Sequence, residues 1–189
     1  MDFTQNRDSG QLWLEDRKWL FETVRDLRPA LAVETGTWKG GGSTFFIASA
    51  LYYNGTGVLV TVENNEGMHN IAKHLYATRW PFLLPHVKFV LGDSVSTLPA
   101  TLADAPLDFI FLDGDQDAEK TRAECLLLTP RLRVGGILMA HDWYAGKADA
   151  IKCYLENNPD WKLETIGAEG VGGCFEKGTV GMAKAIKLK

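Results

Sequence analysis

Five short clusters of polar residues interrupt the apolar stretches of this sequence, and each one directly follows a run of large or β-branched apolar side chains. Carboxylates and a histidine within these clusters can transfer protons, accept hydrogen bonds from hydroxyl groups or bind cations. Glycines in the first cluster would let a ligand approach the backbone closely. The pattern indicates a binding site with acid–base chemistry. The clusters are residues 34–42, Glu63, 92–94, 113–115 and 141–143.

The apolar runs before these clusters predict five parallel strands covered on both faces, because their hydrophobicity is nearly continuous rather than alternating. Helical spacing or helix-start residues mark the windows between them. An open α/β sheet binds ligands outside the carboxyl ends of its strands, where all five clusters fall. The predicted strands are 31–35, 57–63, 87–92, 107–113 and 135–142. The predicted helices are 43–53, 66–79, 94–103, 116–130 and 146–158, with Ser43, Ser94 and Asp117 as N-caps.

Both ends of the chain add further elements. Residues 10–28 predict a leading helix, and residues 161–167 and 172–178 predict an antiparallel hairpin. The expected fold is α/β, a Rossmann-like doubly wound sheet of five parallel strands plus a C-terminal antiparallel hairpin, with helices on both faces. The length of 189 residues fits a single domain. Its expected parts are an N-terminal helical segment (1–29), a ligand-binding core (30–145) and a closing helix and hairpin (146–189).

Composition narrows the class of partner. The net charge of −4 disfavours nucleic acid and anionic lipid surfaces and favours a small-molecule substrate. The longest apolar stretch, 45–53, is too short to span a membrane, and the polar N-terminus lacks a secretory leader, so we expect a cytoplasmic protein. The three cysteines include no C-x-x-C pair and are expected to be buried apolar groups. Self-association into a homo-oligomer is compatible with the sequence.

The glycine-rich turn differs from the G-x-G-x-x-G motif that binds dinucleotides, since Thr37 and Trp38 follow Gly36. A carboxylate at Glu34 would repel a diphosphate but suits a ligand that carries an ammonium and a sulfonium. Glu63, at the end of the second predicted strand, can accept hydrogen bonds from both hydroxyls of a ribose. A tight turn without a ligand, and a capping or solvated acid, are the alternatives for these two features.

The ordered motifs VETGTWKGGGS, GDSVSTLP, FLDGD and GGILMAHDW resemble those of the macrocin O-methyltransferase family and its relatives among class I methyltransferases, over about residues 30–145. The resemblance implies S-adenosylmethionine (SAM) as the methyl donor. It also implies a divalent metal, Mg²⁺ or another ion, on Asp113, His141 and Asp142, with Asp115 and His141 as catalytic proton acceptors. The implied donor-binding residues are Glu34, Gly36, Thr37, Gly40, Glu63, Asp93, Ser94 and Asp113.

Two departures from the family pattern affect the metal and the base. Relatives resemble D-D-Y where this chain has His141, Asp142 and Trp143. Because hard cations prefer oxygen, the histidine weakens a magnesium site and admits manganese, iron, zinc or no metal. Gln116 stands where many broader relatives carry a histidine. Trp143 is expected either to line the pocket or to lie in the core, and Lys147 to be solvated.

The sequence therefore favours SAM-dependent methylation of a small-molecule hydroxyl. One alternative is an NAD-dependent Rossmann oxidoreductase, which Glu63 permits and the absent diphosphate motif opposes. The other is a SAM-fold relative that does not methylate, which His141 beside Asp142 supports. The acceptor is not identified by any motif.

Overall fold

The structure, a computed structural model, describes residues 12–167 and 181–189. The chain divides into two compact units, residues 1–103 and 104–189. The boundary between them falls inside the stretch that the sequence predicts as the ligand-binding core. The expectation of a single domain stays a prediction.

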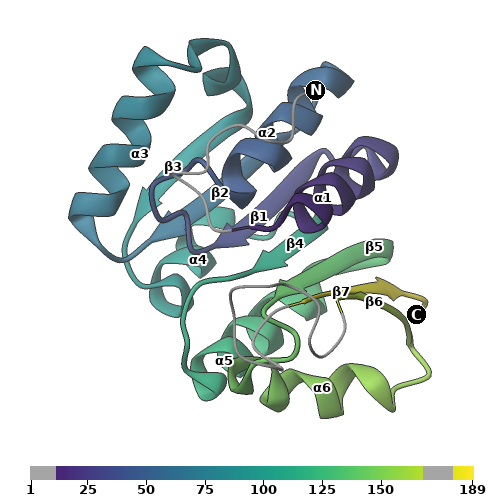
Figure 1. The fold of residues 1–189 in the computed structure, drawn as a ribbon. Coiled ribbons are helices and arrows are strands. Elements are labelled where there is room, and N and C mark those ends of the chain that lie inside the picture. Colours follow the sequence, from purple (N-terminus) through teal and green to yellow (C-terminus); the bar gives the residue numbers. More distant parts are fainter. Residues whose placement is uncertain (1–11, 168–180) are drawn as a thin grey trace. The chain divides into compact units, whose positions relative to one another are not determined.

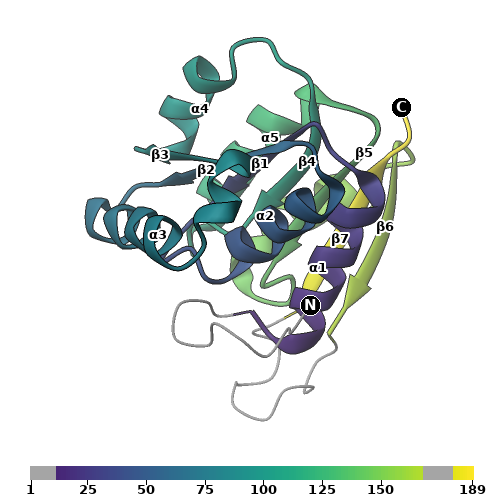
Figure 2. The same ribbon diagram turned by 90° about the horizontal axis from the view of Figure 1, so that it is seen from above.

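Three parallel strands in the order β3-β2-β1 form the sheet of the first unit (Figure 1). Helices α2 and α3 lie on one face of these strands and α4 on the other (Figure 2). The unit's elements are α1 (Leu14–Leu27), β1 (Leu31–Thr35), α2 (Ser43–Asn54), β2 (Val58–Glu63), α3 (Glu66–Thr78), the 3₁₀ helix η2 (Pro81–His86), β3 (Val87–Leu91) and α4 (Ser94–Leu102).

Aromatic side chains tie the helices of the first unit to its strands. Tyr76 of α3 contacts the rings of Trp80 and Phe89, with centroids 5.3 and 4.9 Å apart. Trp80 in turn packs on Phe45 of α2 at 4.7 Å. Such ring pairs contribute about 0.5–1.5 kcal/mol each beyond the area they bury. They fix α2 and α3, the two helices that begin at the carboxyl ends of β1 and β2.

The second unit has two parallel strands, β4 and β5, continued by antiparallel β7 and β6 in the order β4-β5-β7-β6. Helix α5 packs on β4, and α6 packs on α5 and β6 (Figure 1). The unit's elements are β4 (Leu107–Leu112), α5 (Ala118–Leu128), the 3₁₀ helix η3 (Thr129–Arg131), β5 (Leu132–His141), the 3₁₀ helix η4 (Gly146–Ala148), α6 (Asp149–Glu156), β6 (Trp161–Ile166) and β7 (Met182–Lys187).

The five predicted parallel strands and the helices between them are confirmed within a few residues. The predicted caps Ser43 and Ser94 are wrong, because each is the first helical residue and the caps are Gly42 and Asp93. Asp117 caps α5 as predicted. The predicted strand 172–178 lies outside the described residues. The strand that pairs with β6 in the structure is β7. Within the described ranges, no helix is long and apolar enough to cross a membrane.

Gly40 and Gly55 allow a direct test of the contact between α3 and the turn that joins β1 to α2. Both have positive φ, +77° and +68°, where an added Cβ costs about 1–2 kcal/mol. A Cβ at Gly40 would also lie 3.0 Å from Cβ of Ala72, whereas none of the described atoms lies within 4 Å of one at Gly55. We therefore expect Gly40→Ala to lower the free energy of unfolding by about 1–3 kcal/mol more than Gly55→Ala, measured in urea. Equal losses would show that α3 yields without cost.

Candidate active site

The turn after β1 is held by its own backbone against β2. The amides of Gly36 and Thr37 both donate to the Val62 carbonyl, at 3.0 and 3.3 Å, and the amide of Gly40 donates to Thr37 at 2.9 Å. Gly36 has φ of 88°, which glycine adopts readily and other residues rarely do. Trp38 has φ of 47°, and such non-glycine residues concentrate at functional sites. The positive φ of Gly36 accounts for a glycine at this position, and the predicted contact of Gly36 with a ligand stays a prediction.

Glu34 is fully buried beneath this turn. Its Oε2 accepts hydrogen bonds from the hydroxyls of Thr44 and Thr61, each at 2.6 Å. One carboxylate thereby joins the end of β1 to β2 and to the first turn of α2. Direct contact of Glu34 with a ligand stays a prediction, since its shown role is to fix the elements around the turn.

Glu63 is the last residue of β2 and links two loops. Its Oε2 accepts from the Trp38 amide at 2.7 Å, and its Oε1 accepts from the Asn65 amide at 2.9 Å. A carboxylate has about four lone-pair sites, so these two bonds leave acceptor capacity for the hydroxyls of a ribose. The sequence identified Glu63 as an acceptor but not this second role of bracing the Trp38 backbone.

Asp93 follows β3 and caps α4. Its Oδ1 accepts from the Ser96 amide at 3.1 Å, and Ser94 is buried in the first turn of the helix. The amide of Gly92 donates to the Glu63 carbonyl at 2.9 Å, which brings the ends of β2 and β3 together. The predicted adenine contacts of Asp93 and Ser94 stay predictions. The role of Asp93 that the structure shows is to cap α4.

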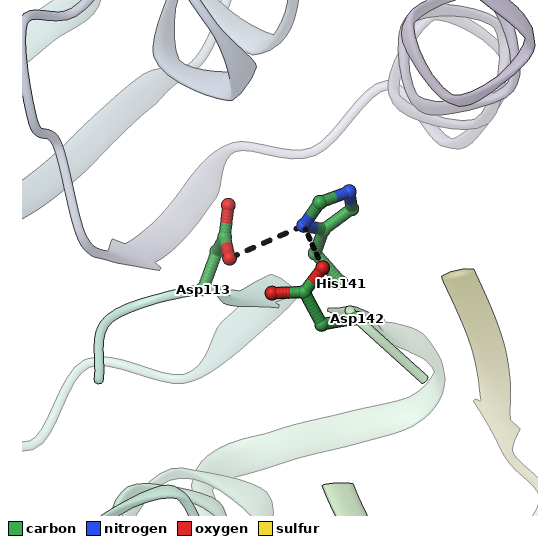
Figure 3. Close-up of side chains that lie close together, drawn as sticks. All are labelled: Asp113, His141 and Asp142. Carbon is green, nitrogen blue, oxygen red and sulfur yellow. Dashed lines mark ion pairs between the residues drawn. The ribbon is translucent and has the colours of Figure 1, made fainter. Parts of the chain in front are cut away.

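A second cluster lies at the carboxyl ends of β4 and β5. Asp113 follows β4, His141 ends β5, and Asp142 is next in the chain. The His141 Nδ1 lies 3.4 Å from Oδ1 of Asp113 and 3.3 Å from Oδ1 of Asp142 (Figure 3). One ligand atom from each residue lies within 4.8 Å of the others. The structure brings these three predicted residues together, and their roles stay predictions.

Lys147 completes this cluster, and the prediction that it is solvated is wrong. Its Nζ lies 2.9 Å from Oδ1 of Asp113 and 3.0 Å from Oδ2 of Asp142. The Lys147 side chain is 2% exposed, whereas those of the two aspartates are 23% and 17% exposed. No sequence signal identified the lysine, because it lies beyond the recognisable motif, in η4.

Mutual pairing shifts the pKa values of Asp113 and Lys147 in the directions that keep both groups charged. Burial pushes the pKa of Asp113 upward, but the positive charge and hydrogen bonding of His141 and Lys147 outweigh it, so this pKa is lower than usual. Burial pushes the pKa of Lys147 downward, but the two carboxylates outweigh it and this pKa is raised. Lys147 is therefore an ammonium at neutral pH and has no lone pair with which to act as a base.

The donor set does not fit a divalent metal while this ammonium is in place. Mg²⁺ binds carboxylate oxygens at about 2.0–2.1 Å and requires their lone pairs. Lys147 already donates to an oxygen of each aspartate. A metal bound to the same two groups would lie within a few ångströms of another cation, in a partly buried place where repulsion is strong.

Two further predicted residues have local roles. Oδ1 of Asp115 accepts from the Asp117 amide at 3.1 Å, and the Asp115 side chain is half-buried. Trp143 is 2% exposed and therefore belongs to the core rather than to a pocket wall. Asp115 lies in the loop between β4 and α5, and its role as a base stays a prediction.

Residues 33–143 match a family described as "Methyltransferase domain". Because the match spans more than half of the chain, the protein belongs to this family of methyltransferases. The narrower resemblance to macrocin O-methyltransferases stays a prediction. No curated protein gives a significant match.

Solved structures share the fold over nearly the whole chain. The O-methyltransferase TomG from Streptomyces achromogenes, in complex with SAM, is 20% identical, with a TM-score of 0.76 over 95% of this chain and 82% of that one. An O-methyltransferase from Bacillus cereus, in complex with SAH, is 21% identical, with a TM-score of 0.74 over 94% and 82%. An rRNA methylase from Streptococcus thermophilus is 14% identical, with a TM-score of 0.69 over 89% and 94%. The expected Rossmann-like methyltransferase fold is confirmed, and it is shared by enzymes with different acceptors.

The Glu34 contacts predict a measurable loss of stability. Thr44→Val keeps the shape of the side chain but removes one hydroxyl donor from a buried carboxylate. We expect a loss of about 1.5–3 kcal/mol in the free energy of unfolding, as for hydrogen bonds to charged groups. The control Thr101→Val removes only a hydroxyl bond to the helix backbone at Thr97, and should cost less. Equal losses in urea unfolding would contradict the structural role of Glu34.

Proposed function

We propose that this chain transfers the methyl group of SAM to a hydroxyl group of a small molecule. The observation that carries the proposal is Glu63, whose carboxylate ends β2 and braces the positive-φ turn at Trp38. The family membership supports methyl transfer, and the SAM and SAH bound in the two O-methyltransferase structures support the donor and the oxygen acceptor.

The chemistry of the first unit suits this donor. SAM carries an ammonium and a sulfonium, so carboxylates near its binding site stabilise it where a dinucleotide diphosphate would be repelled. Glu63 would accept hydrogen bonds from the ribose hydroxyls, and the turn from Gly36 to Gly40 would approach the methionine portion. Asp93 and Ser94 would contact the adenine. The sequence also predicts Asp113, which belongs to the second unit, as a donor-binding residue.

The reaction requires a base that takes the hydroxyl proton and a substrate oxygen aligned with the methyl group. That oxygen forms a bond to the methyl carbon as the carbon–sulfur bond breaks, which leaves SAH, and the hydroxyl proton passes to a base. Sequence reasoning proposes Asp115 and His141 for this role. Asp115 is the better candidate because it is half-exposed, whereas His141 is buried against two carboxylates. His141 would then help to position the cluster.

The sequence also predicts a divalent metal, which this mechanism does not use. A metal held by carboxylates and an imidazole would lower the pKa of an acceptor hydroxyl. Here Lys147 holds both carboxylates, so we derive the proton transfer from Asp115 alone.

A small acceptor is favoured over nucleic acid by the net charge of −4, although the fold is also found in an rRNA methylase. The NAD-dependent alternative is separable by thermal shift. SAH should raise the unfolding temperature and NADH should not, because only a ligand of the native state stabilises it.

Replacement of Glu63 tests the donor site. We expect Glu63→Ala to weaken SAH binding by about 1–3 kcal/mol through the lost ribose hydrogen bonds, measured by calorimetry. Glu66→Ala, at the exposed first residue of α3, is the matched control and should bind as the wild type does. Absence of SAM and SAH binding by the intact protein would overturn the proposed function.

Replacement of Asp115 tests the base. We expect Asp115→Asn to lower kcat by about 10²–10⁴-fold while SAH affinity is retained, because the amide cannot take a proton. Asp117→Asn is the control in the same loop, since asparagine caps a helix as well as aspartate does. The readout is SAH formation, by mass spectrometry, with a panel of phenols and sugars. Full activity of Asp115→Asn on any acceptor that the wild type methylates would exclude this base.

A further inference from the structure

We infer that the Lys147 ammonium is a built-in replacement for a divalent cation, and that it closes the cluster of Asp113, His141 and Asp142 to metal ions. The inference concerns a cluster that the proposed function also uses. It rests on the geometry of that cluster alone, and its test does not require methyl transfer.

The carboxylates of Asp113 and Asp142 need a cation between them. Asp113 and Asp142 follow neighbouring parallel strands, β4 and β5, which place their carboxylates at one edge of the sheet. One oxygen of each carboxylate lies within 4.8 Å of the other. Two partly buried carboxylates this close repel each other unless a positive charge lies between them. A divalent metal or a basic side chain can supply that charge.

Lys147 supplies this positive charge at close range. The ammonium lies 2.9 Å from one aspartate and 3.0 Å from the other, which is the distance of charge-assisted hydrogen bonds. It is also less exposed than either carboxylate, so it is closed off behind them rather than reaching in from solvent.

A hydrogen-bonded turn after β5 positions Lys147 at the cluster. Asp142 has φ of 53°, and the amide of Trp143 donates to the Gly181 carbonyl at 2.9 Å. The amide of Ala145 donates to the Asp142 carbonyl at 2.8 Å, and the 3₁₀ helix with Lys147 begins at the next residue. The same turn thus aims Asp142 at the cluster and returns Lys147 to it.

The Lys147 ammonium excludes a divalent ion from the cluster. An ion at the shared carboxylates would need the oxygens that the ammonium occupies and would add a second cation beside it. Lys147 cannot move aside without losing both ion pairs, and its buried side chain has little solvent around it to replace them. The wild-type cluster should therefore bind no divalent ion, and removal of the ammonium should open a site of two carboxylates and one imidazole, a set suited to manganese.

The experiment measures Mn²⁺ binding by electron paramagnetic resonance and calorimetry, on wild type and on Lys147→Ala. We expect wild type to show no specific site and no change in unfolding temperature with EDTA. Lys147→Ala should bind one Mn²⁺ and be stabilised by it. Adding Asp142→Asn to Lys147→Ala should weaken that binding by roughly tenfold or more, as expected for loss of a metal ligand.

The matched control is Lys152→Ala. Lys152 is also close to this region, pairing with Asp149 at 2.8 Å and lying over the Trp143 ring, but it does not contact the cluster. It should gain no Mn²⁺ site. Lys147→Arg, which retains a positive charge, should gain none either.

Two outcomes would overturn the inference: a wild-type Mn²⁺ site that Asp142→Asn removes, or a folded Lys147→Ala that binds no Mn²⁺. If Lys147→Ala folds only when Mn²⁺ is added, the inference is supported; if it never folds, the wild-type titration decides alone. SAH binding measured on the same wild-type sample tests the proposed function separately, so the two can fail independently.

Discussion

The pairing of one buried ammonium with two carboxylates is the interaction on which the second unit depends. Parallel pairing of β4 and β5 forces Asp113 and Asp142 to the same edge, and an unpaired charge there would be costly to bury. Lys147 resolves this by lying between them. The turn from Asp142 to Ala148 follows from that requirement, since the chain must leave β5 and return within five residues to place the lysine.

The first unit uses carboxylates differently. Glu34 and Glu63 face hydroxyl and amide donors rather than a cation, and each joins elements that are distant in the sequence. Glu34 is fully enclosed and therefore fixes the turn from below. Glu63 lies at the strand end with lone pairs in excess of its backbone bonds, so the residue that braces the loop is also the one suited to hold a ribose.

The sequence predicted much of this arrangement because strand burial and strand-end position are local signals. Continuous apolar runs located β1 to β5, and their carboxyl ends located Asp113, His141 and Asp142 together. It could not predict Lys147, because a lone lysine in a loop is usually solvated and only the tertiary structure shows its burial. Strand β7 was also missed, since its sequence MAKAIK combines alanine and lysine, which are uncommon in strands.

An internal ammonium and a bound metal differ in what they can do for a reaction. A metal with an open coordination position accepts a lone pair from the substrate oxygen and lowers its pKa directly. An ammonium has no such position: it can donate hydrogen bonds and hold charge, and here its contacts with Asp113 and Asp142 are already made. A chain that fixes its cation in this way gains independence from ion concentration but loses Lewis-acid activation. Deprotonation of the acceptor must then come from a carboxylate within reach of solvent, and in the second unit Asp115 has that exposure. In the proposed mechanism the buried lysine would balance the charge and Asp115 would take the proton, two tasks that a single metal ion would combine.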